Sequence, residues 1–313
     1  MLPLVSIICL SYNHKPYIKE ALDSVLNQTH QNIEIIVVDD ASPDGSAEEI
    51  RKYLRPFPQI KFIALAENIG NCKAFNIGFR ESKGKYVIDF AMDDVLLPGR
   101  IEKQVEVFEK LPAHIGVVFS DVGFIDKESR SIGVHYKRDK KGNLLEHIPQ
   151  GNVYKELLER YFISPPSMMV KREVLEKLEG YDETLAYEDF DFWVRSSRIY
   201  QFRFIDEIQT LKRILPHSHG SKFNQKRQHF MLESTLKVCE KAFQLNTSKE
   251  ENKALAKRIR FHSRQALFTE NYSLVKDFYH LLEKLDEESL IDKAWLFLAN
   301  LKMPFYWVYR NFR

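Results

Sequence analysis

Short, unbroken apolar runs alternate with helix-like segments in the N-terminal part of the chain. Leu4–Leu10 is apolar almost throughout, and so is Ile33–Val38. Between them, from Tyr17 to Leu26, apolar residues recur at the spacing of one helix face. Strands that are apolar on both faces and alternate with amphipathic helices are typical of a parallel sheet covered on both sides. The sequence therefore predicts an α/β fold with a mostly parallel sheet and helices on both faces.

Polar residues follow three of the predicted strands at the point where each strand ends. They are Ser11–Asn13, Asp39 with Asp40, and Asp93 with Asp94. Ligands of such sheets bind beyond the carboxyl ends of the strands, so we expect these residues to line one crevice. Two adjacent carboxylates repel each other unless a cation or donor groups compensate. Carboxylate oxygens suit Mg²⁺ or Mn²⁺ bound together with substrate phosphates.

Each acidic pair also has a purely structural interpretation. Asp39 and Asp40 could cap a helix or form a turn, which are common roles of aspartate. Pro98 and Gly99 follow the second pair closely, which fits an exposed turn. The sequence alone leaves both interpretations open.

A third acidic cluster lies at the start of a predicted helix. Glu188, Asp189 and Asp191 precede or enter this helix. Acidic residues in a first turn also complement the helix dipole, which would explain any one of them. Trp193 could stack on a ligand ring, but its helical spacing with Phe190 favours a place in the core.

Composition narrows the class of protein. The chain has 313 residues, 46 basic and 44 acidic side chains, and a formal net charge of +2. A nucleic-acid binder usually has a large basic excess, so nucleic acid is not an expected partner. Cys9, Cys72 and Cys239 show no CxxC spacing, which argues against a disulfide framework or structural zinc. The N-terminus lacks a basic flank and a cleavage site, and we interpret it as a strand of a cytoplasmic protein.

The residue pattern of the sequence changes near Gly220–Asn224. Beyond it, three long helix-compatible stretches contain no glycine. We predict an α/β domain at residues 1–222 and a helical C-terminal extension at 223–313. Residues 294–313 are rich in Trp, Tyr and Phe and include Lys302 and Arg310. This composition suits peripheral contact with the inner face of the cell membrane. The alternative is packing on the α/β domain or on a second subunit of a homo-oligomer.

Taken together, the segments resemble glycosyltransferase family 2, a large family of inverting enzymes with a GT-A fold. The resemblance covers roughly residues 3–220, and its motifs occur in the family's order. The matching segments are Val5–Asn13, Ser24–Thr29, Ile36–Asp44, Glu67–Asn71, Ala74–Gly78, Gly84–Pro98 and Gly180–Arg195.

The resemblance implies a role for most of the polar residues. Tyr12 and Asp40 would contact the nucleobase of a nucleotide-sugar donor, with Asp39 in support. Asp93 and Asp94 would hold the ribose and, through Mn²⁺ or Mg²⁺, the diphosphate. By the same resemblance, the catalytic base is expected in the third acidic cluster, at Asp189.

Two histidines and an arginine complete the residues implied by the resemblance. Arg213, with His217 or His219, falls where the family often has a donor-phosphate or metal contact. The chain departs from the family at Ala91, where many members have the first carboxylate of an Asp-x-Asp-Asp motif. His219 is therefore the expected third metal ligand, although a lone histidine is more often structural.

The implied reaction is transfer of a sugar, with inversion, from a nucleoside-diphosphate sugar to a hydroxyl group. A UDP-linked donor is the commonest in the family, and the acceptor would be a saccharide or a lipid-linked glycan of a bacterial cell surface. A dinucleotide oxidoreductase would need a G-x-G-x-x-G motif after the first strand, which is absent. The competing hypothesis, supported by Ala91, is a degenerate scaffold that binds nucleotide or glycan without catalysis.

Overall fold

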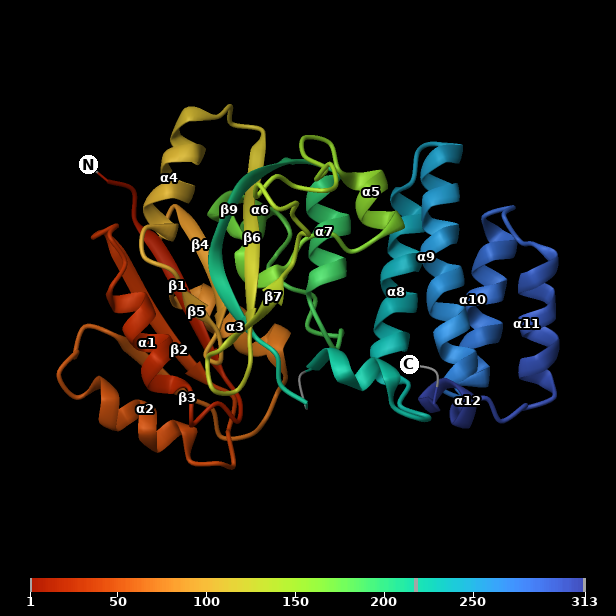
Figure 1. Ribbon diagram of the computed structural model, residues 1–313, viewed down its shortest axis with the longest axis horizontal. Helices are drawn as coiled ribbons and strands as arrows, with labels where there is room; N and C mark the ends of the chain where they lie inside the picture. The colour runs from red at the N-terminus through yellow and green to blue at the C-terminus, as the bar shows by residue number, and fades with distance from the viewer. Residues whose placement is uncertain (1, 217–218, 312–313) are drawn as a thin grey trace. The chain divides into compact units, whose positions relative to one another are not determined.

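The computed structural model describes residues 2–216 and 219–311 (Figure 1). The chain divides into two compact units. Unit 1 comprises Met1–Val153, Phe162–Glu183 and Ile199–Leu215, and unit 2 comprises Tyr154–Tyr161, Thr184–Arg198 and Pro216–Arg313. Two short segments before residue 222 thus pack with the C-terminal helices. The predicted boundary at residue 222 stays a prediction.

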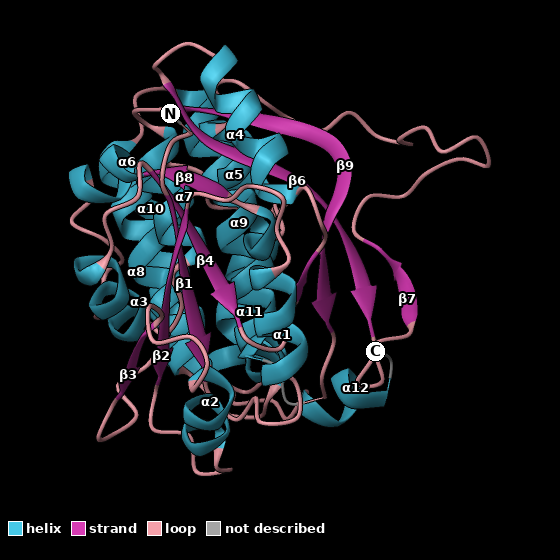
Figure 2. Cartoon of the chain, turned by 90° about the vertical axis from the view of Figure 1, so that its left-hand side faces the viewer, coloured by secondary structure: helices cyan, strands magenta, loops and turns pink. Residues whose placement is uncertain are grey.

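Unit 1 is built on one mixed sheet in the order β3-β2-β1-β4-β8-β6-β9-β5, with β7 paired to β6. Figure 2 shows β3, β2, β1 and β4 side by side. These four strands are parallel, as expected, and so are β6 and β9; the remaining pairs are antiparallel. The strands are β1 (Val5–Ser11), β2 (Ile33–Asp39), β3 (Lys61–Ala64), β4 (Tyr86–Ala91), β5 (Val95–Leu96), β6 (Ile115–Ile125), β7 (Ser131–Val134), β8 (Met169–Lys171) and β9 (Gln201–Arg213).

Helices cover both faces of this sheet. Alternate residues of β1, such as Ile7, pack with the apolar faces of α1, α2 and α4 in one core. On the opposite face, Ile8 meets α3 so closely that a Cβ on Gly78 would lie 2.6 Å from its Cγ2. The α/β class predicted from the sequence is therefore confirmed. The helices of unit 1 are α1 (Ile18–Leu26), α2 (Ser46–Leu54), α3 (Asn71–Glu81), α4 (Arg100–Lys110), η1 (Pro165–Ser167) and α6 (Arg172–Lys177).

Unit 2 is helical and has its own apolar core. Val238, Leu255, Ile259 and Phe278 are fully buried in it, and Ser248 caps α9 by accepting a hydrogen bond from the Glu251 amide. No helix among the described residues is long and apolar enough to cross a bilayer. The helices are α5 (Tyr154–Glu159), α7 (Asp189–Ser197), η2 (His219–Asn224), α8 (Phe230–Leu245), α9 (Lys249–Phe268), α10 (Tyr272–Lys284), α11 (Leu290–Asn300) and α12 (Tyr306–Asn311).

Candidate active site

The ends of three parallel strands meet at one edge of the sheet in unit 1. Ser11 at the end of β1 pairs with Asp39 at the end of β2, and Leu10 pairs with Ala91 at the end of β4. The Asp40 amide continues this pattern, donating to the Ser11 carbonyl over 2.9 Å. Parallel pairing therefore brings the polar residues that follow these strands to the same edge. We call this region the strand-end site.

Asp39 and Asp40 each organise a loop at this site. The Asp39 carboxylate accepts hydrogen bonds from the Ser42 amide at 3.0 Å and the Ser42 hydroxyl at 2.7 Å. Asp40 accepts from the amides of Ile69 and Gly70 at 2.8 and 3.0 Å. Burial raises the pKa of Asp40, while these two amides partly oppose the effect. Asp39 and Asp40 thus do have the turn-forming role that the sequence left open. Each carboxylate has about four lone-pair positions, so each can still accept hydrogen bonds from a ligand.

Asp94 is a buried carboxylate held by backbone. Its side chain is buried, and its Oδ1 accepts from the Arg213 amide at 2.8 Å. Burial, and then the negative charge of Asp93, raise the pKa of Asp94 well above its ordinary value. A cation bound here would offset both effects, since each acts by disfavouring the ionised carboxyl.

Arg213 is buried beneath the site, and its guanidinium is used by the protein itself. Nε donates to the Asp93 carbonyl at 2.8 Å, and Nη1 donates to the Asp126 carbonyl at 2.7 Å. Nη2 donates to Glu20 at 2.6 Å, and the group lies 4.4 Å from the centre of the Tyr17 ring. In this geometry Arg213 braces the Asp93–Asp94 turn. Its expected contact with donor phosphate stays a prediction.

His14 lies beside the acidic pair, which sequence reasoning did not anticipate. Its Nε2 is 3.7 Å from Asp93 Oδ1, and its amide donates to Ser46 Oγ. Two buried polar atoms at this edge, His14 Nδ1 and Ser11 Oγ, have no hydrogen-bond partner within the described residues. In the sequence, its position directly after the Ser11–Asn13 segment could have indicated that His14 belongs to the site. Tyr12, in that segment, is 43% exposed, as a side chain available for stacking must be.

The donor set at the strand-end site fits a divalent cation that also binds a ligand. Asp93 supplies carboxylate oxygen and His14 an imidazole nitrogen, both of which Mn²⁺ accepts. Among the described residues, no group of three or more His, Cys, Asp or Glu side chains could hold a metal by itself. A metal would therefore need ligand oxygens, such as those of a diphosphate. His217 and the side chain of His219, the expected third ligand, lie outside the described part of the structure.

In unit 2, Asp189 is the first residue of α7, and its neighbour Asp191 anchors that helix. Asp191 is buried, accepts from Lys241 Nζ on α8 at 2.6 Å and pairs with Arg195 Nε at 2.7 Å. Trp193 is 1% exposed, so its predicted place in the core is confirmed. These contacts fix the turn of helix from which the Asp189 side chain extends.

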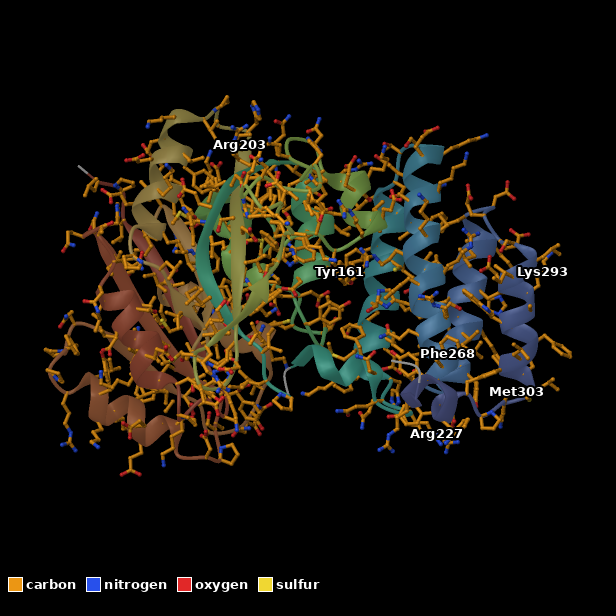
Figure 3. All side chains as sticks on the ribbon, viewed as in Figure 1. Tyr161, Arg203, Arg227, Phe268, Lys293 and Met303 are labelled. Atoms are coloured by element: carbon orange, nitrogen blue, oxygen red, sulfur yellow. The ribbon has the colours of Figure 1, made fainter. Side chains whose placement is uncertain are left out.

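An aromatic cluster surrounds Tyr161 in unit 2, and the sequence did not single it out. The Tyr161 ring lies 5.6 Å from that of Trp193, and the Arg258 guanidinium lies 3.7 Å from its centre (Figure 3). Its hydroxyl is 3.4 Å from that of Tyr187. Burial raises the pKa of the Tyr161 hydroxyl, and the negative charge of Asp189 contributes to the same shift. Tyr161 thus lies near Asp189, and although its ring is packed in this cluster, the residue as a whole is 38% exposed.

Comparison with known proteins gives consistent matches. The family model described as glycosyl transferase family 2 matches residues 6–179. An uncharacterized glycosyltransferase of Methanocaldococcus jannaschii is 33% identical over 245 residues, 75% of this chain and 79% of that protein. An uncharacterized glycosyltransferase of Rickettsia bellii is 32% identical over 70% of this chain, but this chain covers only 31% of that protein.

Solved structures resemble the chain in fold. TarS 1–349 of S. aureus, in complex with UDP-GlcNAc, superposes with a TM-score of 0.69 at 16% identity, over 99% of this chain and 93% of that one. The mannosyltransferase PcManGT of Pyrobaculum calidifontis, in complex with GDP-Man and Mn²⁺, has a TM-score of 0.58 at 18% identity, over 99% and 83%. At these identities the likeness concerns the fold alone.

Proposed function

Because the chain belongs to glycosyl transferase family 2 and has the GT-A fold of such transferases, we propose that it moves a sugar from a nucleoside-diphosphate sugar to a hydroxyl group. The acceptor in this proposal is a saccharide or a lipid-linked glycan of a bacterial surface, and the reaction inverts the anomeric carbon. The observation that carries the proposal is the strand-end site, where Asp93 and Asp94 lie beside the unpartnered buried atoms of Ser11 and His14. Such atoms are expected where a polar ligand supplies the missing hydrogen bonds.

The nucleotide would bind along the strand-end site. Tyr12 is exposed enough to stack on the base, and Asp40 keeps lone pairs for a base N–H. We favour a uridine nucleotide, since the TarS structures contain UDP and UDP-GlcNAc, although PcManGT contains GDP-Man. Ser11 Oγ and His14 Nδ1 would bond to the ribose or the diphosphate.

Asp93, Asp94 and His14 are the described residues that would hold Mn²⁺ or Mg²⁺, with His219 as the further expected ligand. A divalent ion would supply positive charge to the departing diphosphate. The protein's own contribution is to keep Asp93 and Asp94 in one turn, which Arg213 does through its hydrogen bonds to both.

Asp189 is the proposed general base. The acceptor hydroxyl would give its proton to the Asp189 carboxylate while its oxygen forms a bond to the anomeric carbon. The bond from that carbon to the phosphate oxygen would break, and the nucleoside diphosphate would leave with the electron pair. Attack from the face opposite the leaving group inverts the anomeric centre. Tyr161, a residue that is 38% exposed and lies near Asp189, would contact the acceptor sugar with its accessible part.

The first experiment is a calorimetry and thermal-shift panel of UDP, GDP, dTDP and CDP, each with Mn²⁺, Mg²⁺ or EDTA. The proposal requires one nucleotide to bind and the metal to strengthen its binding. No response to any nucleotide would favour the degenerate scaffold that Ala91 suggests.

Turnover assays then test the base. General-base help is worth about 10²–10⁴-fold, so Asp189→Asn should lose most turnover while it keeps nucleotide affinity. Asp277→Asn, which changes an exposed aspartate on α10, is the matched control and should behave as wild type. Full activity of Asp189→Asn would exclude the assigned role.

A further inference from the structure

The outward face of α11 is apolar and uncovered. Leu290, Phe297 and Leu301 recur at the spacing of one helix face and are 86, 62 and 56% exposed. The opposite side of the helix, with Asp292 and Ala299, is buried. Figure 1 shows why: α11 is the last helix of its row in unit 2, and it packs against α10 and α9 on its inner side.

Two further exposed apolar residues follow the helix in the chain. Met303 is 41% exposed and Trp307, at the start of α12, is 72% exposed. The turn between them is held in place, because the Tyr272 hydroxyl donates to the Met303 carbonyl at 2.8 Å. We call the surface formed by Leu290, Phe297, Leu301, Met303 and Trp307 the α11 face.

Within the segment that carries this face, the exposed charges are all basic. Between Leu290 and Asn311 the exposed charged side chains are Lys293, Lys302 and Arg310. The single acid in this segment, Asp292, is buried and paired with Arg260 at 3.0 Å. Lys293 and Met303 are labelled on this side of unit 2 in Figure 3.

The basic residues gather toward one end. Three acids, Asp286, Glu287 and Glu288, precede the helix, whereas Lys302 and Arg310 follow it. Lys226, from another segment, also lies at this second end, 5.8 Å from the ring of Tyr306, where it is paired with Glu270 at 3.2 Å. An apolar strip with a tryptophan and a basic rim at one end matches the interface of an anionic bilayer.

We propose that the α11 face docks on an anionic lipid bilayer, with the Trp307 end inserted most deeply. No described helix could span the membrane, so the contact would be interfacial. A second copy of the chain fits less well. The strip on α11 alone has a projected area on the order of 200 Å². Each partner of a stable interface buries about 800 Å² of accessible surface, so a second copy would also have to cover polar surface beyond the strip. Docking does not depend on the proposed reaction and would hold equally for a non-catalytic scaffold.

Vesicle flotation of the full chain tests this proposal. The vesicles are phosphatidylcholine alone, or phosphatidylcholine with about a third of phosphatidylglycerol, since basic residues respond to anionic lipid. We expect wild type to float with the anionic vesicles and to detach at high salt. Leu301→Ser/Trp307→Ser should weaken binding by more than about tenfold, because two exposed apolar side chains lose their burial in lipid. Lys302→Glu/Arg310→Glu should lose at least about fivefold in affinity for the anionic vesicles for each residue changed.

A matched control changes equally exposed apolar residues elsewhere. Ile132→Ser/Leu145→Ser alters side chains of unit 1 that are 55 and 64% exposed, and it should float like wild type. Circular dichroism of all variants confirms that each is folded. The proposal is wrong if wild type floats with neither vesicle, or if Leu301→Ser/Trp307→Ser floats unchanged. A dimer seen by light scattering that this variant abolishes would overturn it too, since the face would then cover a second copy.

Discussion

Replacing Arg213 by alanine should destabilise unit 1 strongly, independently of any effect on ligand binding. The side chain is 2% exposed and links four parts of unit 1: the carbonyls of Asp93 and Asp126, Ser129, and Glu20. The Asp126 carbonyl keeps a second donor, the Ser129 amide, whereas the Asp93 carbonyl loses the guanidinium donor that holds its turn.

The expected loss can be worked from these contacts. A buried acceptor left without its donor costs about 1–3 kcal/mol, and a hydrogen bond from a charged group is worth about 1.5–3 kcal/mol. The cation–π contact with Tyr17 adds about 0.5–2 kcal/mol. The ion pair with Glu20 adds little, because that side chain is 42% exposed and solvent screens it. Water entering the space left by the side chain recovers part of the sum, so we expect a loss of about 3–5 kcal/mol.

Urea denaturation followed by two signals measures the loss in free energy of unfolding and distinguishes unit 1 from unit 2. The three tryptophans, at positions 193, 295 and 307, all belong to unit 2, so their fluorescence follows unit 2. Far-UV circular dichroism follows both units. Arg130→Ala is the control, because its side chain is 73% exposed and pairs with Asp126 in the same region. If Arg213→Ala lies within 1 kcal/mol of this control (about the cost of an exposed pair), the bracing role is refuted.

Three further changes probe other parts of the fold. Gly84→Ala places a Cβ 2.4 Å from a backbone nitrogen of β1 and should lower the free energy of unfolding by about 1–3 kcal/mol or more in denaturant titrations. The comparison is Gly142→Ala, where φ is +87° and nothing lies within 4 Å; this change should lower it by only about 1–2 kcal/mol. Burial lowers the pKa of His262 to about 3, so the unfolded chain binds its proton first as pH falls below 6.5. Unit 2 should then lose up to about 1.4 kcal/mol per pH unit relative to His262→Phe, and equal slopes in tryptophan-monitored titrations would contradict this. Lys241→Met leaves the buried Asp191 with one cation fewer and should lower the fluorescence midpoint by the equivalent of about 1.5–3 kcal/mol.

The architecture of unit 1 could be predicted because its signals are local. Apolar periodicity distinguishes strands such as Val5–Ser11 from helices such as Ile18–Leu26, and parallel pairing then brings the strand ends together. The antiparallel strand β8 has three residues, too few for any periodicity to show. The positions of α5 and α7 in unit 2 depend on contacts with helices far along the chain, which no local pattern encodes.

The candidate site shows the same limit at the level of single side chains. Residue type and position after a strand identified Asp39, Asp40 and Asp94, but not their partners. Those partners, such as Gly70 for Asp40 and the Arg213 amide for Asp94, lie 30 and 119 positions away. A sequence pattern can thus nominate a carboxylate, but whether it points to a loop or to a ligand depends on the tertiary structure.

The charge of the strand-end site bears on whether Ala91 indicates a degenerate enzyme. Amide and hydroxyl donors already compensate Asp39 and Asp40, and burial disfavours the ionised form of Asp94. Alanine at position 91, in place of a carboxylate, removes one more negative charge, and the side chain beside Asp93 is the imidazole of His14 and not another carboxylate. A site with so little net negative charge holds a free divalent ion weakly, because attraction between opposite charges is its main source of affinity. The diphosphate of a donor would supply the missing negative charge and oxygen ligands. On this argument Ala91 would make any metal binding depend on the nucleotide, and it does not by itself indicate a degenerate enzyme.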